Sequence, residues 1–152
     1  MLKDKVIIRS LEERDLLALV LLCEEHAIYE KAVYDPTGKV ESLQRHFFLS
    51  ENSINCLVIS YQQILIGYAS FVKQFSTWDA NFYIYLDCLY LKEEYRGQGL
   101  GRLMMEELKK HAILEGCDVQ WQTPDFNKPA IRFYESLGAE HKTKERFFWK
   151  LI

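Results

Sequence analysis

The sequence predicts a mixed α/β domain built around one central sheet. Two observations carry this prediction: β-branched runs recur between helical stretches, and a helical spacing of apolar residues begins at Leu100, soon after the last long strand-like run. No Pro- or Ser-rich stretch divides the 152 residues. We therefore expect one domain over residues 1–152, large enough to bury a core.

Composition excludes several classes of protein. Hydrophobic residues make up 49% of the chain, which argues against disorder. The 19 basic and 22 acidic side chains give a net charge of −3, so we expect no duplex nucleic acid as partner. The longest apolar run, Leu16–Cys23, is too short to span a membrane, and no signal segment precedes it. We expect a cytoplasmic protein without a membrane partner.

The first elements are a strand and two helices. The β-branched run Val6–Arg9 predicts a strand. Ser10 and Glu13 have the spacing of a capping box, which predicts a helix to about His26. A weaker helical stretch covers Val40–Leu49.

Three long strands follow. Two of them, Ile54–Ser60 and Ile64–Gln74, flank the polar turn 61–63 and predict a hairpin. The third covers Asn81–Leu91. These strands form an antiparallel meander after the two helices.

The last elements follow a Gly-rich loop. Asn127 is placed as an N-cap and Gly138 as a C-terminal stop, which brackets a helix. The predicted elements are a helix over 100–115, a strand over 118–122, a helix over 127–137 and a strand over 146–152.

The loop Arg96–Gly101 joins a strand to a helix. Exposed N–H groups and the helix dipole make such a position suited to an anion, and glycines let the anion approach the backbone. A dinucleotide fingerprint is excluded, because Arg102 stands where the last glycine is required, and a P-loop motif is absent. The cysteines and histidines have no metal-ligand spacing, so we expect no metal and free thiols.

Two motifs together resemble a known family. The first is R-x-x-G-x-G on Arg96, Gly99 and Gly101; the second runs from Asn127 to Ala139. Both resemble the GNAT superfamily of acetyl-CoA-dependent N-acetyltransferases. The resemblance implies a mixed, mostly antiparallel twisted sheet of six to seven strands, flanked by about four helices and splayed between strands 4 and 5. It also implies that acetyl-CoA contacts Leu89, Tyr90, Leu91, Arg96, Gly97, Gln98, Gly99, Leu100, Gly101, Arg102, Asn127 and Ala130.

Within the superfamily, the spermidine/spermine (diamine) acetyltransferase branch is most similar. Tyr85–Gly99 looks like its strand 4 and loop, and Tyr29 with Glu30 looks like the pair that lines its amine site. The branch has Glu-Asp where this chain has Asp87 and Cys88, so one acid is shortened and the other is lost. The resemblance implies Tyr29, Glu30 and Asp87 as acceptor-binding residues.

Two side chains are candidates for proton transfer. An alkyl ammonium has a pKa of about 10.4, so about one molecule in 2500 is free base at pH 7. Asp87, on the strand face expected to hold Tyr85 and Leu89, is the candidate base; the alternative is an acid hydrogen-bonded to a loop. The family pattern matches Tyr134 to the phenol that protonates the leaving thiolate, and core packing is the alternative role.

The expected function is acetyl transfer from acetyl-CoA to a small cationic primary amine, by direct attack in a ternary complex. A peptide N-terminal or lysine acetyltransferase and a non-catalytic acyl-CoA-binding module are the alternatives. The residues do not name the acceptor. Family resemblance implies a homodimer, and the aromatic run Phe147–Trp149 suits a subunit contact, although core packing explains it equally well.

Overall fold

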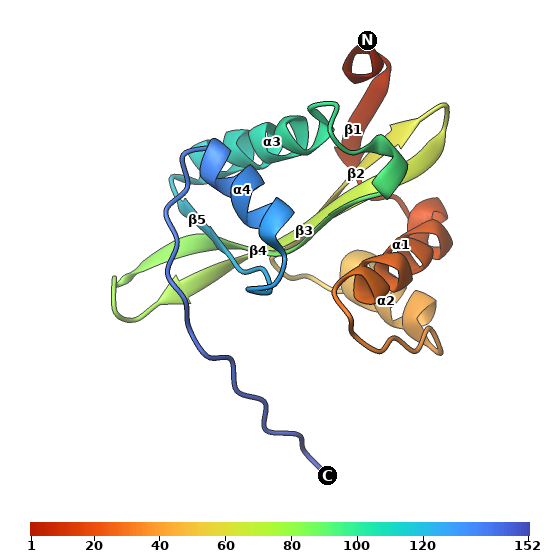
Figure 1. The fold of residues 1–152 in the computed structure, drawn as a ribbon. Coiled ribbons are helices and arrows are strands. Elements are labelled where there is room, and N and C mark those ends of the chain that lie inside the picture. Colours follow the sequence, from red (N-terminus) through yellow and green to blue (C-terminus); the bar gives the residue numbers. More distant parts are fainter. The chain divides into compact units, whose positions relative to one another are not determined.

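The computed structural model describes residues 1–152 and divides into two compact units, Met1–Gln122 and Thr123–Ile152. The first unit holds the sheet and three α-helices, and the second holds one α-helix and the C-terminal segment (Figure 1). No helix has both the length and the apolar character that a membrane crossing requires.

One five-stranded sheet forms the centre of the first unit, in the order β1-β2-β3-β4-β5. Its strands are β1 (Val6–Ser10), β2 (Ile54–Tyr61), β3 (Ile64–Ser76), β4 (Asn81–Leu91) and β5 (Asp118–Trp121). All neighbours are antiparallel except β4 and β5, which are parallel. The hairpin between β2 and β3 is confirmed, and Gln62 and Gln63 turn the chain with positive φ. The predicted mixed, mostly antiparallel sheet is therefore confirmed.

Four α-helices agree with the predicted number: α1 (Leu16–Tyr29), α2 (Lys39–Phe48), α3 (Leu100–Glu115) and α4 (Lys128–Ser136). Helices α1 and α2 lie over one face of the sheet and α3 lies over the other (Figure 1). Residues spaced by four along α3, from Leu100 to Ala112, are buried against the sheet. The helical spacing in the sequence thus reflects burial of one side of α3.

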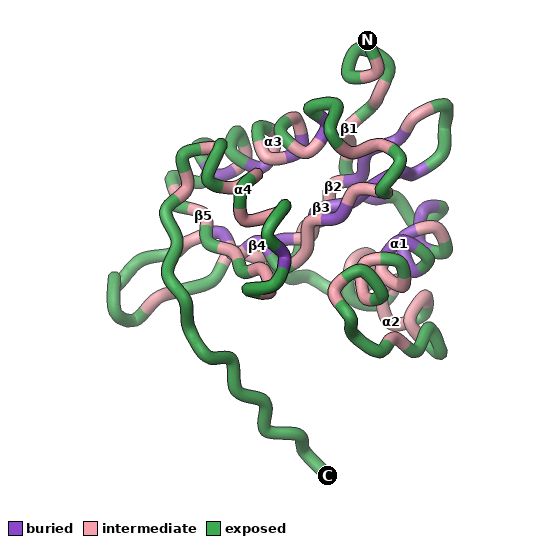
Figure 2. The backbone as a smooth tube through the Cα atoms, in the orientation of Figure 1, coloured by how far each residue is buried: buried purple, intermediate pink, exposed green.

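The sheet separates two buried clusters (Figure 2). The cluster toward α3 contains Ile59, Ile66, Phe71, Ile84, Leu86, Leu100, Met104 and Leu108. The cluster toward α1 contains Leu16, Leu19, Leu22, Cys56, Val58, Leu65, Tyr68 and Tyr90. Each fully buried Leu or Ile contributes about 1.5–3 kcal/mol through its removal from water. The helices are thus fixed to the sheet on both sides.

The predicted capping box at Ser10 is wrong. Ser10 is the last residue of β1, and α1 begins at Leu16. The Asp15 carboxylate holds the segment between β1 and α1 in place. It accepts hydrogen bonds from the Glu12 backbone N–H at 2.8 Å and from the Arg9 guanidinium at 2.6 and 2.9 Å. A charge-assisted bidentate pair is stronger than a serine cap, so the helix begins later.

The predicted strand over Arg146–Ile152 is also wrong, and the sheet has five strands where six to seven were expected. Residues from Glu140 onward are exposed and carry no regular structure. A strand exists only through hydrogen bonds to a neighbour, and this segment has none. Its alternating apolar residues were therefore not sufficient to make a strand.

The second unit confirms the predicted helix boundaries. The Asn127 side chain accepts a hydrogen bond from the Ala130 N–H at 3.3 Å, so Asn127 is the N-cap of α4. Gly138 follows the helix with φ of 87°, the left-handed conformation of a C-terminal stop.

Candidate active site

Strand β5 covers only part of the length of β4. Their parallel ladder runs from Tyr83–Asp118 to Leu86–Trp121 and ends there. β4 continues to Leu91, and its last four residues, Cys88–Leu91, are paired only with β3. The end of β5 leaves backbone groups of β4 beyond Leu86 without a partner on this side of the sheet, and such groups are available to a ligand.

A β-bulge places Asp87 at the start of this open segment. Ser70 pairs with Cys88 and Phe71 pairs with Leu86, so Asp87 is an extra residue without a partner on β3. The bulge changes which face the following residues occupy, because Leu86 and Leu89 both pack in the cluster toward α3. Asp87 and Leu89 were expected on one face, and that expectation is wrong. The Asp87 side chain is exposed.

The glycine loop leads from the end of β4 into α3. Gly97 and Gly99 have φ of 74° and 82°, and a Cβ at either position would meet no atom within 4 Å. Gly99 is the N-cap of α3 and offers no side chain to the first-turn N–H groups. Leu100 is fully buried and anchors the loop. The space over Gly97 and Gly99, next to the N-terminus of this 16-residue helix, is therefore open. A helix N-terminus with such open space beside it suits an anion.

Arg96 stabilises the loop from behind. Its Nε donates to the Leu91 carbonyl at 2.7 Å, and its guanidinium lies 4.3 Å from the centre of the Tyr29 ring and 5.3 Å from that of Tyr90. Cation–π contacts with both rings fix the charge beside the loop. Arg96 therefore connects the glycine loop with α1.

The cluster toward α1 brings Tyr29, Glu30 and Tyr90 together through His26. The His26 ring stacks on the Tyr90 ring at a centroid distance of 5.1 Å. The Tyr29 ring also contacts the Tyr90 ring, at a centroid distance of 6.4 Å. His26 forms an ion pair with Glu30, and its Nδ1 lies 2.8 Å from the Tyr68 hydroxyl.

Tyr90 itself is held by a close backbone contact. A Cβ at residue 67 would lie 2.6 Å from the Tyr90 carbonyl oxygen, so only glycine fits there. Gly67 thus allows β3 and β4 to approach where the aromatic cluster sits.

Three thiols line the face toward α1. Burial raises the pKa of Cys56 and of Cys88 to about 12, and burial also raises the pKa of Cys23. Neutral thiols are poor nucleophiles, so Cys88 is unsuited to carry an acetyl group despite its place beside Asp87.

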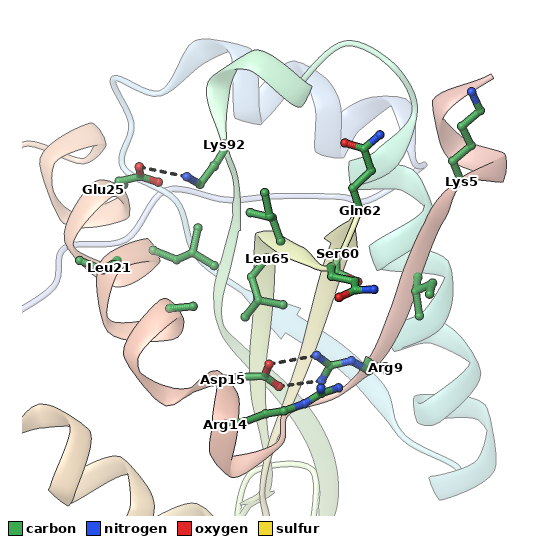
Figure 3. Close-up of a pocket in the computed structure, with 15 residues that line it drawn as sticks. Lys5, Arg9, Arg14, Asp15, Leu21, Glu25, Ser60, Gln62, Leu65 and Lys92 are labelled. Atoms are coloured by element: carbon green, nitrogen blue, oxygen red, sulfur yellow. Dashed lines mark hydrogen bonds and ion pairs between the residues drawn. The ribbon is translucent and has the colours of Figure 1, made fainter.

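Two pockets adjoin α1. A pocket of about 300 Å³ is lined by Tyr29, Tyr90 and Arg96 together with Glu25, Ile28, Lys92, Glu93 and Glu94. A larger one of about 690 Å³ lies between β1, the β2–β3 hairpin and α1 (Figure 3). The Arg9–Asp15 pair and the Lys92–Glu25 pair contribute to its walls. Its wall includes no residue of 83–91, so Asp87 and its neighbours on β4 are not part of this pocket.

Three expected site residues, Asn127, Ala130 and Tyr134, belong to the second unit. Asn127 and Ala130 form the cap of α4, and the Tyr134 ring packs 5.3 Å from that of Phe133. The capping role of Asn127 is thus confirmed, and Tyr134 is half-buried on a helix without fully buried residues.

Sequence reasoning missed two residues of this region, His26 and Tyr68. His26 and Glu30 have the i, i+4 spacing of a helical pair, which was a usable signal. Tyr68 lies 42 residues from His26, and only the fold joins them.

The fold and a family match define the class of protein. The model of the acetyltransferase (GNAT) family matches residues 18–139, and the chain belongs to this family. It is therefore an acetyl-CoA-dependent N-acetyltransferase, an enzyme that transfers acetyl groups to amines.

Individual relatives agree with this class. The chain is 31% identical to thialysine N-epsilon-acetyltransferase of Bos taurus over 148 residues, which cover 91% of this chain and 86% of that protein. It is 29% identical to an L-ornithine N5-acetyltransferase of Arabidopsis thaliana over 102 residues, 66% of this chain and 42% of that protein. It is 26% identical to a human spermidine/spermine N(1)-acetyltransferase-like protein over 87% of this chain and 20% of that protein.

A solved structure supports the fold alone. An aminoglycoside acetyltransferase from an uncultured soil metagenomic sample superposes with a TM-score of 0.82 at 19% identity, with 100% of each chain covered.

Proposed function

We propose that this enzyme acetylates the terminal primary amine of a small cationic acceptor, by direct attack on acetyl-CoA in a ternary complex. The observation that carries the proposal is the bulge at Asp87. An exposed carboxylate without a partner on β3 stands where β4 leaves β5. Bulges of this kind re-aim a side chain beside a site, and a carboxylate there attracts an ammonium.

Asp87 acts as the base. Attack requires a neutral amine, and deprotonating an alkyl ammonium at pH 7 costs roughly 4.6 kcal/mol. A carboxylate oxygen of Asp87 takes this proton directly or through one water, because aspartate has a short reach. Cys88 does not act as a nucleophile, since its thiol stays neutral.

Tyr134 acts as the acid. The amine nitrogen forms its bond to the acetyl carbon and the carbon–sulfur bond breaks, while the Tyr134 hydroxyl gives its proton to the departing sulfur. The acetylated nitrogen then releases its extra proton to solvent and the Tyr134 oxygen regains one from solvent, which leaves a neutral amide, a thiol and a neutral phenol. A phenol with an ordinary pKa near 10 can protonate a thiolate whose acid has a pKa near 8.5.

Acetyl-CoA, the co-substrate of the family, supplies the activated acetyl group, and the loop fits its phosphates. The uncapped N-terminus of α3 and the open space over Gly97 and Gly99 are the features that a pyrophosphate requires. The residues proposed to hold it are the backbone of Leu89–Leu91, the loop Arg96–Arg102, Asn127 and Ala130.

Charge favours a cationic acceptor. Glu30 and Asp87 both lie in the first unit, and residues 1–60 carry ten acidic side chains against seven basic ones. The names of two relatives, thialysine N-epsilon- and L-ornithine N5-acetyltransferase, also point to an amine at the end of a short chain. We propose that Tyr29 and Glu30 bind the acceptor and Asp87 receives the reacting amine.

Release of coenzyme A tests the acceptor class. The purified enzyme and acetyl-CoA would be mixed with 1,5-diaminopentane, 5-aminopentanol, lysine, ornithine and a lysine-containing peptide, and mass spectrometry would locate the acetyl group. We expect fast release with small diamines or basic amino acids and modification at the terminal amine. Release with the peptide alone would replace the proposal with a protein acetyltransferase, and binding of acetyl-CoA without release would indicate a binding module.

The assembly and location are also proposed. We propose that both units act as one catalytic domain over residues 1–152, since the family match crosses their boundary. A homodimer is supported by the exposed side chains of Phe147, Phe148, Trp149, Leu151 and Ile152 and by the unpaired outer edge of β5. Four free cysteines support a reducing, cytoplasmic location. Light scattering of the intact chain and of a chain ending at residue 145 tests the dimer.

A further inference from the structure

The larger pocket beside α1 includes neither Asp87 nor any residue of the glycine loop. It has a volume of about 690 Å³ and is bounded by β1, the β2–β3 hairpin and α1 (Figure 3). Cavities of about 300–1,000 Å³ hold small organic ligands. All its lining residues belong to the first unit. The chemistry of these residues therefore defines which ligand the pocket can hold.

Part of the pocket wall is apolar and exposed. Ile7 on β1 is 61% exposed, Leu21 on α1 is 57% exposed and Ile64 on β3 is 62% exposed. Three large aliphatic side chains from three elements thus line one cavity without being covered by the fold. A ligand that covers them removes apolar area from water, which is favourable. This part of the wall fits an apolar ligand body.

A buried hydroxyl faces the cavity. Ser60 on β2 is only 6% exposed, and no group of the chain forms a hydrogen bond with its side chain. Every fully buried polar side-chain atom has a hydrogen-bond partner, so the Ser60 hydroxyl reaches the open space of the pocket that it lines. A buried polar group without a protein partner is unusual. A polar atom of a ligand would supply the missing partner.

The turn of the β2–β3 hairpin adds two unpaired amides. Gln62 and Gln63 both line the pocket, and neither side chain has a hydrogen-bond partner in the chain. Their φ angles of 50° and 66° are left-handed, a conformation that two-residue hairpin turns usually assign to Asn or Gly. Residues held in such strained conformations cluster at ligand sites. Both amides can donate hydrogen bonds to a ligand.

The charge of the lining favours an anion. It includes two acidic side chains, Asp15 and Glu25, and four basic ones, Lys5, Arg9, Arg14 and Lys92. The whole chain has a net charge of −3, so this positive excess is a local feature. A pocket of this kind attracts a ligand whose negative charge adjoins an apolar part.

Lys92 is the cation available to hold that charge. Arg9 and Arg14 are each hydrogen-bonded to a carboxylate of the chain. Lys92 Nζ, in contrast, lies 3.6 Å from Glu25 Oε1, which is beyond hydrogen-bond distance. A carboxylate that comes closer can therefore take the place of Glu25.

Lys92 and Ser60 flank the same end of β3. The Lys92 backbone N–H donates to the Ile66 carbonyl at 2.8 Å, and Ser60 on the opposite neighbour strand is the register partner of Leu65. Figure 3 accordingly shows Leu65 between them. A carboxylate over Leu65 can accept hydrogen bonds from the Lys92 ammonium and from the Ser60 hydroxyl.

We propose that this pocket binds a small organic carboxylate with an apolar body, held by Ser60 and Lys92, and that its binding strengthens the binding of the cationic acceptor. The second part rests on the proposed function.

The pair of Lys92 and Glu25 links the two sites. Both residues line the larger pocket and also the pocket of about 300 Å³ that contains Tyr29. A bound carboxylate competes with Glu25 for Lys92. Glu25 then faces the smaller pocket without its counter-charge, so a cation beside Tyr29 is attracted more strongly.

Binding to the full chain tests the site without relying on turnover. Calorimetry would compare octanoate, octan-1-ol, octylamine and inorganic phosphate, and backbone amide NMR would locate each ligand. We expect octanoate to bind most tightly and to shift the amide signals of β1 and residues 60–65. Three results would each overturn the proposal: no octanoate binding at these residues, equal binding of octan-1-ol or octylamine, and equal binding of phosphate.

Two variants test the proposed contacts. Ser60→Ala and Lys92→Gln should each weaken octanoate binding roughly tenfold, because each removes one donor to a charged group. The controls Ser53→Ala and Lys109→Gln change exposed residues outside the pocket and should bind as the wild type does. Urea unfolding would confirm that all four variants fold. Wild-type affinity in both Ser60→Ala and Lys92→Gln would refute the assigned contacts.

The link to the acceptor is measured with 1,5-diaminopentane as the probe. We expect saturating octanoate to lower its Kd by about fivefold, and the diamine to lower the octanoate Kd by the same factor. Glu25→Gln should abolish this effect and keep octanoate binding, whereas Glu24→Gln, outside both pockets, should keep the effect. Unchanged diamine affinity would overturn the second part. Absence of coenzyme A release with every amine would instead refute the proposed function and leave octanoate binding as a separate result.

Discussion

The two faces of the central sheet are built on different principles. Toward α3, the buried side chains are all apolar, from Ile59 on β2 to Leu108 on α3. Toward α1, thiols, phenols and an imidazole are packed among leucines, and each buried polar atom has a partner. Burying such groups is costly unless they are bonded, so a polar network that only packed would be inefficient. We therefore expect substitutions toward α3 to affect stability, and substitutions on the face toward α1 to affect turnover as well.

Removing the bulge acid should have the largest effect. Asp87→Asn keeps the shape but loses the base, so we expect turnover to fall by about 10²–10⁴-fold, with unfolding unchanged because the side chain is exposed. Coenzyme A release measures the rate. Asp79→Asn, in the β3–β4 turn, is the matched control and should keep the wild-type rate. Equal rates for the two variants would remove Asp87 from the mechanism.

Tyr134, the proposed acid, lies in the second unit, so its substitution tests the chemistry without changing either face of the sheet. Tyr134→Phe should lower turnover by roughly 10²-fold and leave acetyl-CoA affinity nearly unchanged, because a general acid acts on the leaving group. Turnover and calorimetric binding would be measured on the same preparation. Normal turnover with unchanged affinity would show that the Tyr134 hydroxyl has no part in the reaction.

The apolar face should respond in the opposite manner. Leu108→Ala leaves a cavity under α3, and we expect a loss of about 3 kcal/mol in the free energy of unfolding measured in urea. Leu114→Ala on the same helix changes an exposed side chain and should cost less than about 0.5 kcal/mol. Folded Leu108→Ala should turn over normally; a large loss of turnover below its melting range would break the division between the faces.

The sequence was most informative where local rules decide the structure. The four-residue spacing in α3, the polar turn at Gln62 and the Asn127 cap all depend on near neighbours, and each was correct. The bulge at Asp87 was not predictable, because an extra residue is defined only against its partner strand β3. The apolar alternation after Arg146 failed for the same reason, since a strand requires a partner.

The polar network was also beyond the sequence. Tyr68 and His26 meet only after β3 and α1 pack, and Arg9 reaches Asp15 only after β1 turns into α1. The sequence predicts the motifs of the candidate site. It does not predict the side-chain contacts between these motifs, because those contacts form only when the elements pack.

The ion pair at the start of α1 tests whether charge on this face also stabilises the fold. Hydrogen bonds from Arg9 lower the pKa of Asp15, so the pair contributes above the unfolded pKa, near 3.9, and its contribution is lost as pH falls through the lower folded value. We expect Asp15→Asn to cost about 2 kcal/mol at pH 7, because it leaves Arg9 without its counter-charge. The difference from wild type in urea unfolding should shrink below about pH 4. Asp118→Asn, an exposed acid on β5, is the control, and equal losses in both variants would contradict a specific pair.

The glycine loop, where the two faces meet, should show the smallest and most specific effect. Gly99→Ala places a methyl group in open space at φ of 82°, so the strain is about 1 kcal/mol, but the methyl occupies the approach of the phosphates. We expect KM for acetyl-CoA to rise roughly tenfold, equivalent to about 1.4 kcal/mol, with kcat nearly unchanged. Gly38→Ala is the matched control, since Gly38 caps α2 with φ of 72° and is equally open. If both variants lose the same stability and only Gly99→Ala loses affinity, the loop binds the co-substrate; equal KM values would assign the glycines to chain geometry alone.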